Sequence, residues 1–290
     1  RRAAEAKAAE AERKLRAAEA KAEEEKQRRA AAAGKSPAAW YSEGLALGRN
    51  GEKKWPEAIK AFQNCVALDA NHSEAWFELG DAYFWQNGMN HCEASFEPYT
   101  RCIALDPKHT VAHGNLGSVL QYVRKDYDGA ERHYRKAIEL DPKHAFAHNS
   151  LGALLQDVRK DYDGAEKMYR KAIELDPNFA AALINLGLFF KDVRKDYEGA
   201  ERHYRKAIEL DPKHAQAHNK LGIVLHERKD YDGAINMCRK AIALDPKDVS
   251  AHVNLGKLLN DVRKDYDGAE RHYRKAIELD PSEAMAHNNL

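Results

Sequence analysis

The sequence predicts an all-α protein in which antiparallel helix pairs stack into an α-solenoid behind one long N-terminal helix. The tripeptide Leu-Asp-Pro recurs at steps of 35, 35, 35, 34 and 35 residues, with its prolines at Pro107, Pro142, Pro177, Pro212, Pro246 and Pro281. Within each step the apolar residues keep the three- and four-residue spacing of helices. Because a unit of this size cannot bury its own apolar face, repetition at this period indicates a stacked array.

Residues 1–35 are predicted to form the long N-terminal helix. Residues 1–33 are almost wholly Ala, Glu, Lys and Arg, with Leu15 the one large aliphatic residue. Helix propensity is high for these residue types, and Gly34 is expected to end the helix. A thin seam of alanines around Leu15 favours docking on a partner or a weak coiled coil. A free charged helix or a tether is the alternative.

Each repeating unit is predicted to be two helices joined by a turn, as in the unit Ala145–Pro177. Leu151 and Leu155 are four residues apart in its first half, so they share one helical face. In its second half, Ala165 lies four residues before Tyr169. Small residues at Gly152, Ala165 and Ala172 allow the two helices to approach closely, and Tyr162 and Tyr169 are expected to fill the gaps beside them.

The ends of these helices are marked by capping residues. Asp161 is a plausible N-cap of the second helix, because its carboxylate can accept from free backbone N–H groups there. Pro177 cannot continue a helix, so it closes the unit. At the start of the array, Ser36 and Pro37 are expected to cap and open the first helix.

These residues resemble the tetratricopeptide repeat, which reads Trp-x2-Leu-Gly-x2-Tyr, then Ala-x3-aromatic, then Pro. The match is carried by Trp76, Leu79, Gly80 and Tyr83 and by Ala165, Tyr169 and Pro177. The resemblance implies a right-handed superhelix over residues 36–290. It implies seven repeats, 37–70, 73–107, 110–142, 145–177, 180–212, 215–246 and 249–281, and a partial eighth at 284–290.

Two departures from the repeat pattern are visible. Most units carry one extra residue, placed in the turn between their helices, such as Val158–Asp161, whereas the sixth unit does not. In the second unit, Pro98 falls inside the expected second helix. A proline there loses a backbone donor and clashes with the preceding turn, so we expect a kink.

Asparagines recur on the first helices and are candidates for a peptide-binding groove. Asn115, Asn185 and Asn254 each precede a Leu-Gly pair, and Asn149 and Asn219 lie one residue earlier. An amide both donates and accepts, which suits an extended peptide backbone. The pattern is similar to the asparagine ladder in the repeat arm of O-GlcNAc transferase. The alternative is that asparagine is simply tolerated on a wet helix face.

The first two units carry aromatic and acidic residues near the same face. Tyr41, Phe77, Asp81 and Trp85 are the candidates for ligand contact at this end of the groove, because exposed aromatic side chains serve as anchors in interfaces. Trp40 and Trp76 occupy the packing position of the repeat and are interpreted as core residues.

Histidine is abundant, and three His-x3-His pairs occur, one of them His144 with His148. No carboxylate or cysteine completes a ligand set at a fixed spacing, so we predict no metal site. We expect the second histidine of each pair to pack as a neutral imidazole. The stability of the fold should then fall below the ordinary histidine pKa of about 6.5.

Composition restricts the classes of partner. The chain has 47 basic and 46 acidic residues, so no overall charge favours nucleic acid. A repeated Arg-Lys pair, Arg159-Lys160 in the fourth unit, is diluted by the aspartate that follows. No apolar run approaches the roughly 20 residues that span a bilayer, and no signal peptide is visible. Four cysteines, read as small buried thiols, suit a reducing compartment, so an intracellular and cytoplasmic location is expected.

The predicted function is a non-catalytic scaffold that binds a peptide or helix in its groove, within a larger assembly. The chain begins at Arg1 and stops at Leu290 within a helix, which indicates a segment of something longer. No catalytic residues, cofactor or phosphate-binding loop are predicted. One alternative is the substrate-recruiting arm of a larger enzyme such as an O-GlcNAc transferase-like glycosyltransferase, and another is a structural spacer.

Overall fold

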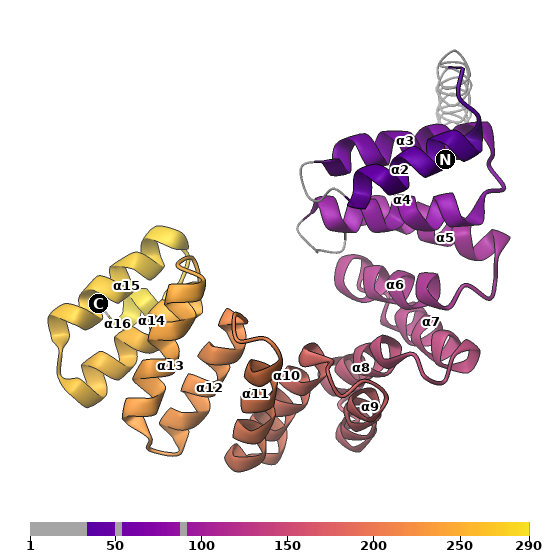
Figure 1. Ribbon diagram of the computed structural model, residues 1–290. Coiled ribbons are helices and arrows are strands. Elements are labelled where there is room, and N and C mark those ends of the chain that lie inside the picture. The colour runs from indigo at the N-terminus through magenta and orange to yellow at the C-terminus, as the bar shows by residue number, and fades with distance from the viewer. Residues whose placement is uncertain (1–33, 50–53, 88–91, 290) are drawn as a thin grey trace, which may run out of the picture. The chain divides into compact units, whose positions relative to one another are not determined.

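The computed structural model describes residues 34–49, 54–87 and 92–289. The chain divides into two compact units, Arg1–Pro142 and Lys143–Leu290. In the described residues every regular element is helical, and consecutive helices pack as pairs within each unit (Figure 1). The all-α array of helix pairs predicted from the sequence is confirmed. The helix predicted for residues 1–35 lies, except for Gly34 and Lys35, outside the described residues.

The N-terminal unit contains three helix pairs, and each pair lies within one predicted repeat. Its helices are α2 (Pro37–Arg49), α3 (Trp55–Leu68), α4 (Ser73–Gln86), α5 (Phe96–Leu105), α6 (Thr110–Val119) and α7 (Tyr127–Leu140). A 3₁₀ turn, η2 (Glu93–Ser95), precedes α5, and a π-helical turn, η3 (Leu120–Arg124), follows α6.

The C-terminal unit contains four helix pairs and the start of a further helix. Its helices are α8 (Ala145–Leu154), α9 (Tyr162–Leu175), α10 (Ala180–Phe189), α11 (Tyr197–Leu210), α12 (Ala215–Glu227), α13 (Tyr231–Leu244), α14 (Val249–Leu258), α15 (Tyr266–Leu279) and α16 (Ala284–Asn289). Three π-helical turns follow first helices: η4 (Leu155–Arg159), η5 (Phe190–Arg194) and η6 (Leu259–Arg263).

Paired helices approach closely because a glycine of the first helix faces a tyrosine ring of the second. A Cβ atom at Gly117 would lie 2.7 Å from a ring carbon of Tyr134, so no larger residue fits without movement. The same contact joins Gly152 to Tyr169, which is buried as predicted. Tyr162 is 40% exposed, so the prediction that it fills a gap was wrong. It is the first residue of α9 and lies at the edge of the repeat.

Capping side chains fix where the helices begin. Asp161 accepts a hydrogen bond from the backbone N–H of Gly164 at 3.0 Å, which confirms it as an N-cap. Ser36 caps α2 in the same way, accepting from Ala39 N–H at 3.2 Å. Four of the first helices, α4, α6, α8 and α12, use an imidazole instead. For example, His109 Nδ1 accepts from Ala112 N–H at 3.1 Å. Histidine was not predicted as a cap.

The extra residue of the 35-residue units is accommodated as a π-helical turn. In η4, the N–H of Asp161 reaches back to the carbonyl of Leu155 at 3.0 Å, and Lys160 between them is left-handed with φ of 57°. The 34-residue sixth repeat has no such turn, and α12 runs to Glu227 as an α-helix. The insertion therefore lengthens the end of the first helix.

The kink expected at Pro98 was wrong. Helix α5 begins at Phe96, later than the second helices of the other repeats, because the 3₁₀ turn η2 replaces its first turn. Pro98 is thus the third residue of the helix, where the backbone N–H has no intrahelical acceptor in any case. A proline in this place removes no hydrogen bond.

Candidate functional site

The predicted asparagines of the C-terminal unit meet in pairs across neighbouring first helices. Asn185 of α10 donates through Nδ2 to Asn149 Oδ1 of α8 at 3.0 Å, and Asn254 of α14 donates to Asn219 Oδ1 of α12 at 2.9 Å. Asn149 is 7% exposed and Asn219 is 3% exposed, whereas Asn185 and Asn254 are half-buried. We call the side of the first helices that carries these amides the amide face.

The two halves of each pair therefore have different roles. Asn149 and Asn219 are too deeply buried to form much of a ligand surface, and they orient the half-exposed amides. Among the described residues, no hydrogen bond engages Oδ1 of Asn185 or Asn254. Each of these two amides keeps an acceptor and one N–H at the surface, in an orientation fixed by a buried neighbour.

In the N-terminal unit the asparagine pairs with a carboxylate instead of a second amide. Asp81 of α4 accepts from Asn115 Nδ2 of α6 at 3.0 Å and from the Tyr99 hydroxyl of α5 at 2.7 Å. Burial raises the pKa of the Asp81 carboxyl, although the hydrogen bonds from Tyr99 and Asn115 oppose this shift. Two sequence-predicted residues, Asp81 and Asn115, are thus in direct contact.

Two further carboxylates lie near Asp81 on α4. The pKa of Glu78 is raised to about 7 by burial and then by the charges of Asp81 and Glu74, while Arg49 opposes them. The pKa of Tyr41 is raised as well, by burial and then by Glu78 and Glu74. This part of the amide face is therefore strongly acidic.

Aromatic rings border the acidic residues. Tyr41 lies 4.7 Å from the His72 ring, and Phe77 lies 4.5 Å from the His109 ring, measured between centroids. Both are half-buried. Trp85 is 42% exposed and stacks on Trp55 with centroids 6.2 Å apart. All three aromatic residues predicted as contacts retain exposed surface.

The histidines form caps and pairs in the described residues. Four first helices begin at a histidine whose Nδ1 accepts a backbone hydrogen bond: His72, His109, His144 and His214. Among residues 34–49, 54–87 and 92–289, no three or more His, Cys, Asp or Glu side chains gather as they would around a metal ion. Of the four cysteines, Cys65, Cys102 and Cys238 are buried free thiols as expected, whereas Cys92 is a half-buried free thiol.

The arginines of the repeated Arg-Lys pairs bind acidic residues of the preceding repeat. Arg194 donates to Asp163 at 2.6 Å and to Glu166 at 2.9 Å. Equivalent ion pairs join Arg124 to Glu93, Arg228 to Glu201 and Arg263 to Asp232. These arginines are consequently engaged in holding neighbouring repeats together.

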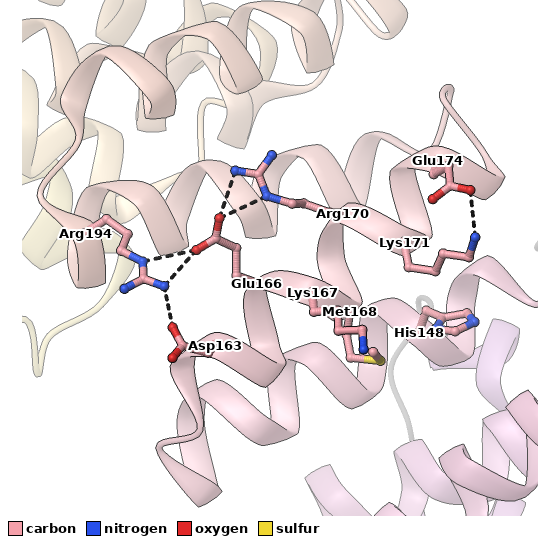
Figure 2. Close-up of a pocket in the computed structure, with 9 residues that line it drawn as sticks. All are labelled: His148, Asp163, Glu166, Lys167, Met168, Arg170, Lys171, Glu174 and Arg194. Atoms are coloured by element: carbon pink, nitrogen blue, oxygen red, sulfur yellow. Dashed lines mark hydrogen bonds and ion pairs between the residues drawn. The ribbon is translucent and has the colours of Figure 1, made fainter.

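A hollow of about 630 Å³ lies along α9, and Figure 2 shows the side chains that line it. Its charged groups largely neutralise one another. Glu166 accepts from Arg170 at 2.8 Å and from Arg194, and Lys171 pairs with Glu174 at 2.7 Å. With its arginines paired and no nucleophile oriented by a base in its lining, the hollow has no arrangement suited to catalysis.

Sequence reasoning missed Glu78 and Tyr99 as members of the acidic cluster. Glu78 stands directly before Leu79-Gly80, the position that asparagine holds in other repeats. This position relative to the Leu-Gly pair could have predicted Glu78, because it places the carboxylate on the amide face. Tyr99 had no such signal, since its hydroxyl reaches Asp81 only through the packing of α5 against α4.

The fold and this face define a helical-repeat interaction scaffold. A family model of the tetratricopeptide repeat matches residues 41–88, 115–178 and 194–249, and a second model of the same repeat matches residues 249–283. The matches cover more than half of the chain, so the protein belongs to the tetratricopeptide repeat family. Members of this family are in general protein-binding scaffolds. The likeness to the arm of O-GlcNAc transferase stays a prediction.

Solved structures with the same fold are numerous, whereas no curated protein matches the sequence. YrrB, a tetratricopeptide repeat protein with an unusual peptide-binding site, is 23% identical, with a TM-score of 0.50 over 66% of this chain and 96% of YrrB. PilF of Pseudomonas aeruginosa is 22% identical, with a TM-score of 0.63 over 76% of this chain and 96% of PilF.

Human IFIT1, solved as a dimer with m7Gppp-AAAA, is 20% identical, with a TM-score of 0.69 over 88% of this chain and 62% of IFIT1. At these identities the likeness shows the fold alone. Within the described residues, no helix has both the length and the apolar character needed to cross a bilayer.

Proposed function

We propose that the protein is a scaffold that binds a peptide or helix of a partner protein along its amide face, as part of a larger assembly. The observation that carries this proposal is the orientation of Asn185 and Asn254 by buried partners. A ligand that bonds to a side chain already held in place loses less conformational entropy than one that must order it. The two amides are suited to the backbone of a peptide.

Apolar side chains beside the amides would supply the contact area. Leu188 is three residues after Asn185 on α10, so the two share one side of that helix. Leu188 and its neighbour Ile184 are half-buried, as is Ile223 of α12. This mixture of oriented amides and partly exposed aliphatic groups is typical of a surface that binds extended or helical segments.

In the N-terminal unit, charge complementarity favours a basic residue in the ligand. Glu78 and Asp81 are carboxylates with raised pKa values, and Tyr41 and Phe77 border them. A lysine or arginine side chain of the ligand would neutralise the carboxylates and contact the rings. YrrB, which has the same fold, has a peptide-binding site, and this is consistent with a peptide as the ligand here.

The proposal is tested by selecting displayed random 12-residue peptides on the full chain and measuring their affinities by calorimetry. The double variant Asn185→Ala, Asn254→Ala should bind about 10- to 30-fold more weakly, because two hydrogen bonds of about 1 kcal/mol each are lost. Asn236→Ala, on the exposed side of α13, is the matched control. Melting curves would establish that all variants fold.

The acidic residues of the N-terminal unit are tested separately with the same library. Peptides that bind this unit should share a lysine or arginine, and Glu78→Gln should remove that preference without affecting peptides that bind the C-terminal unit. Equal affinities for the wild-type chain and the double asparagine variant would show that the ligand does not use the amides.

A further inference from the structure

Two repeats join their helices through a pair of histidines, one buried and one half-buried. In the third repeat (110–142), His113 of α6 lies against His133 of α7, with the two Nδ1 atoms 2.9 Å apart. In the seventh repeat (249–281), His252 of α14 lies against His272 of α15, with the Nδ1 atoms 3.0 Å apart. Each pair is a hydrogen bond between the two helices of one repeat.

Backbone carbonyls fix which ring nitrogen carries the proton. His113 Nε2 lies 3.2 Å from the carbonyl oxygen of Pro107, and His252 Nε2 lies 3.2 Å from that of Pro246. A carbonyl oxygen only accepts, so each of these Nε2 atoms carries a hydrogen and each Nδ1 is an acceptor. His133 and His272 must therefore donate through Nδ1–H, and all four imidazoles are neutral.

Protonation of both rings is incompatible with this arrangement. An imidazolium has a hydrogen on both nitrogens, so two charged rings would face each other with N–H groups about 3 Å apart. A single added proton can enter at Nε2 of His133 or His272 and keep the hydrogen bond, whereas a second proton on the same pair cannot be accommodated. Burial lowers the pKa of His133 and of His272, so even that first charge is opposed.

The surrounding charges do not compensate. The pKa of His133 is lowered to about 4 by burial and then by His113 and Arg132, with Asp126 opposing. Burial also lowers the pKa of His113, and Lys136 and His109 add to this while the Pro107 hydrogen bond and Asp106 oppose it. The pKa of His272 is lowered by burial, His252, Arg271 and Arg239, with Asp265 opposing.

We propose that these two histidine pairs are acid-sensitive contacts that hold the helices of the third and seventh repeats together at neutral pH and release them on acidification. The proposal goes beyond the proposed function and needs no ligand. Other repeats provide internal controls, because the position of His133 is occupied by Met168 in the fourth repeat and by Met237 in the sixth.

The direction of the effect follows from proton linkage. Above the ordinary histidine pKa of about 6.5, both the folded and unfolded states are neutral at these sites and the pairs contribute fully. As the pH falls below this value, the unfolded chain binds protons that the folded pairs exclude, so stability is lost. The loss continues down toward about pH 4, the folded-state pKa of His133.

Nuclear magnetic resonance of the imidazole nitrogens tests the arrangement directly in the full chain. At pH 7.5, His113 and His252 should be in the Nε2–H form, and His133 and His272 in the Nδ1–H form. Observation of the Nε2–H form for His133 or His272 at this pH would overturn the proposal.

Amide hydrogen exchange, corrected for the intrinsic effect of pH, tests whether the paired helices separate on acidification. Between pH 7.5 and pH 5, protection of α6, α7, α14 and α15 should fall at least 10-fold relative to α2 and α3, which contain no histidine. The variant His133→Met, His272→Met should remove this difference, and methionine is tolerated at that position in the same chain. If α6 and α14 keep their protection relative to α2 and α3, or if the variant retains the same pH response, the proposal fails.

Discussion

The replacement of tyrosine by phenylalanine should have opposite effects at two equivalent positions, Tyr204 and Tyr134. Both side chains are 0% exposed, and both occupy the same place in the second helix of their repeats. The Tyr134 hydroxyl donates to Gln121 Oε1 at 2.9 Å and lies 3.2 Å from Ser118 Oγ. The Tyr204 hydroxyl is buried without a hydrogen-bond partner among the described residues.

The difference arises from two substitutions in the fifth repeat (180–212). Lys191 stands where Gln121 is found in the third repeat, and its ammonium pairs with Asp192 instead. Leu188 stands in place of Ser118. Neither replacement supplies an acceptor to the Tyr204 hydroxyl, although the ring still packs against Gly187.

The magnitudes follow from the balance of hydrogen bonding and desolvation. A buried polar group without a partner costs about 1–3 kcal/mol, so Tyr204→Phe should stabilise the fold by about 1 kcal/mol. Tyr134→Phe leaves the buried Gln121 Oε1 without its donor and should destabilise the fold by about 1–2 kcal/mol. At about 2–4 °C per kcal/mol for a chain of this size, the two variants should melt roughly 5–10 °C apart.

Thermal unfolding followed by circular dichroism at pH 7.5 measures this difference. The expected order of melting temperatures is Tyr204→Phe, then wild type, then Tyr134→Phe. A Tyr204→Phe variant that melts as low as Tyr134→Phe would refute the reasoning, because the hydroxyl would then have a favourable partner such as an ordered water.

Two further substitutions test the contacts between paired helices. Met237→His should place a donor beside His218, which is 1% exposed and has no hydrogen-bond partner for its Nδ1. The new hydrogen bond should contribute about 1 kcal/mol and raise the melting temperature at pH 8 by about 2–4 °C. Met237→Leu is the control and should give no gain. Gly117→Ala should lower stability by about 1–3 kcal/mol because the new methyl group would overlap the Tyr134 ring, and a denaturant midpoint equal to that of the wild type would contradict the close packing.

The repeat architecture was predictable because its signals are local and recur. The Leu-Asp-Pro spacing, the small residues of the paired helices and the capping aspartates such as Asp161 each depend on residues within one repeat. Seven copies made the period unmistakable. The kink at Pro98 was predicted wrongly for the same reason. The other repeats implied a helix through that position, whereas a local 3₁₀ turn delays its start.

The sequence did not predict which asparagines would be buried and which would stay half-exposed. Asn149 and Asn219 differ from Asn185 and Asn254 by one position relative to the Leu-Gly pair, and one residue on a helix is a rotation of about 100°. That rotation turns the first two amides toward a neighbouring helix and leaves the other two half-exposed. The one-residue offset is visible in the sequence, but the packing of neighbouring first helices decides which amides are buried and which stay half-exposed.

Because the repeats are nearly identical, their few differences at buried polar positions have separable effects. A carboxylate in place of serine at Asp81 makes the N-terminal amide face acidic. Lysine in place of glutamine at Lys191 leaves a tyrosine hydroxyl without an acceptor. Methionine in place of histidine at Met237 removes an acid-sensitive contact. Each of these repeats is built from the same pair of packed helices, so each difference is a natural substitution experiment. Exchanging the residue at one of these positions between repeats should therefore transfer one property only: negative charge for Asp81, hydroxyl pairing for Lys191, or acid sensitivity for Met237.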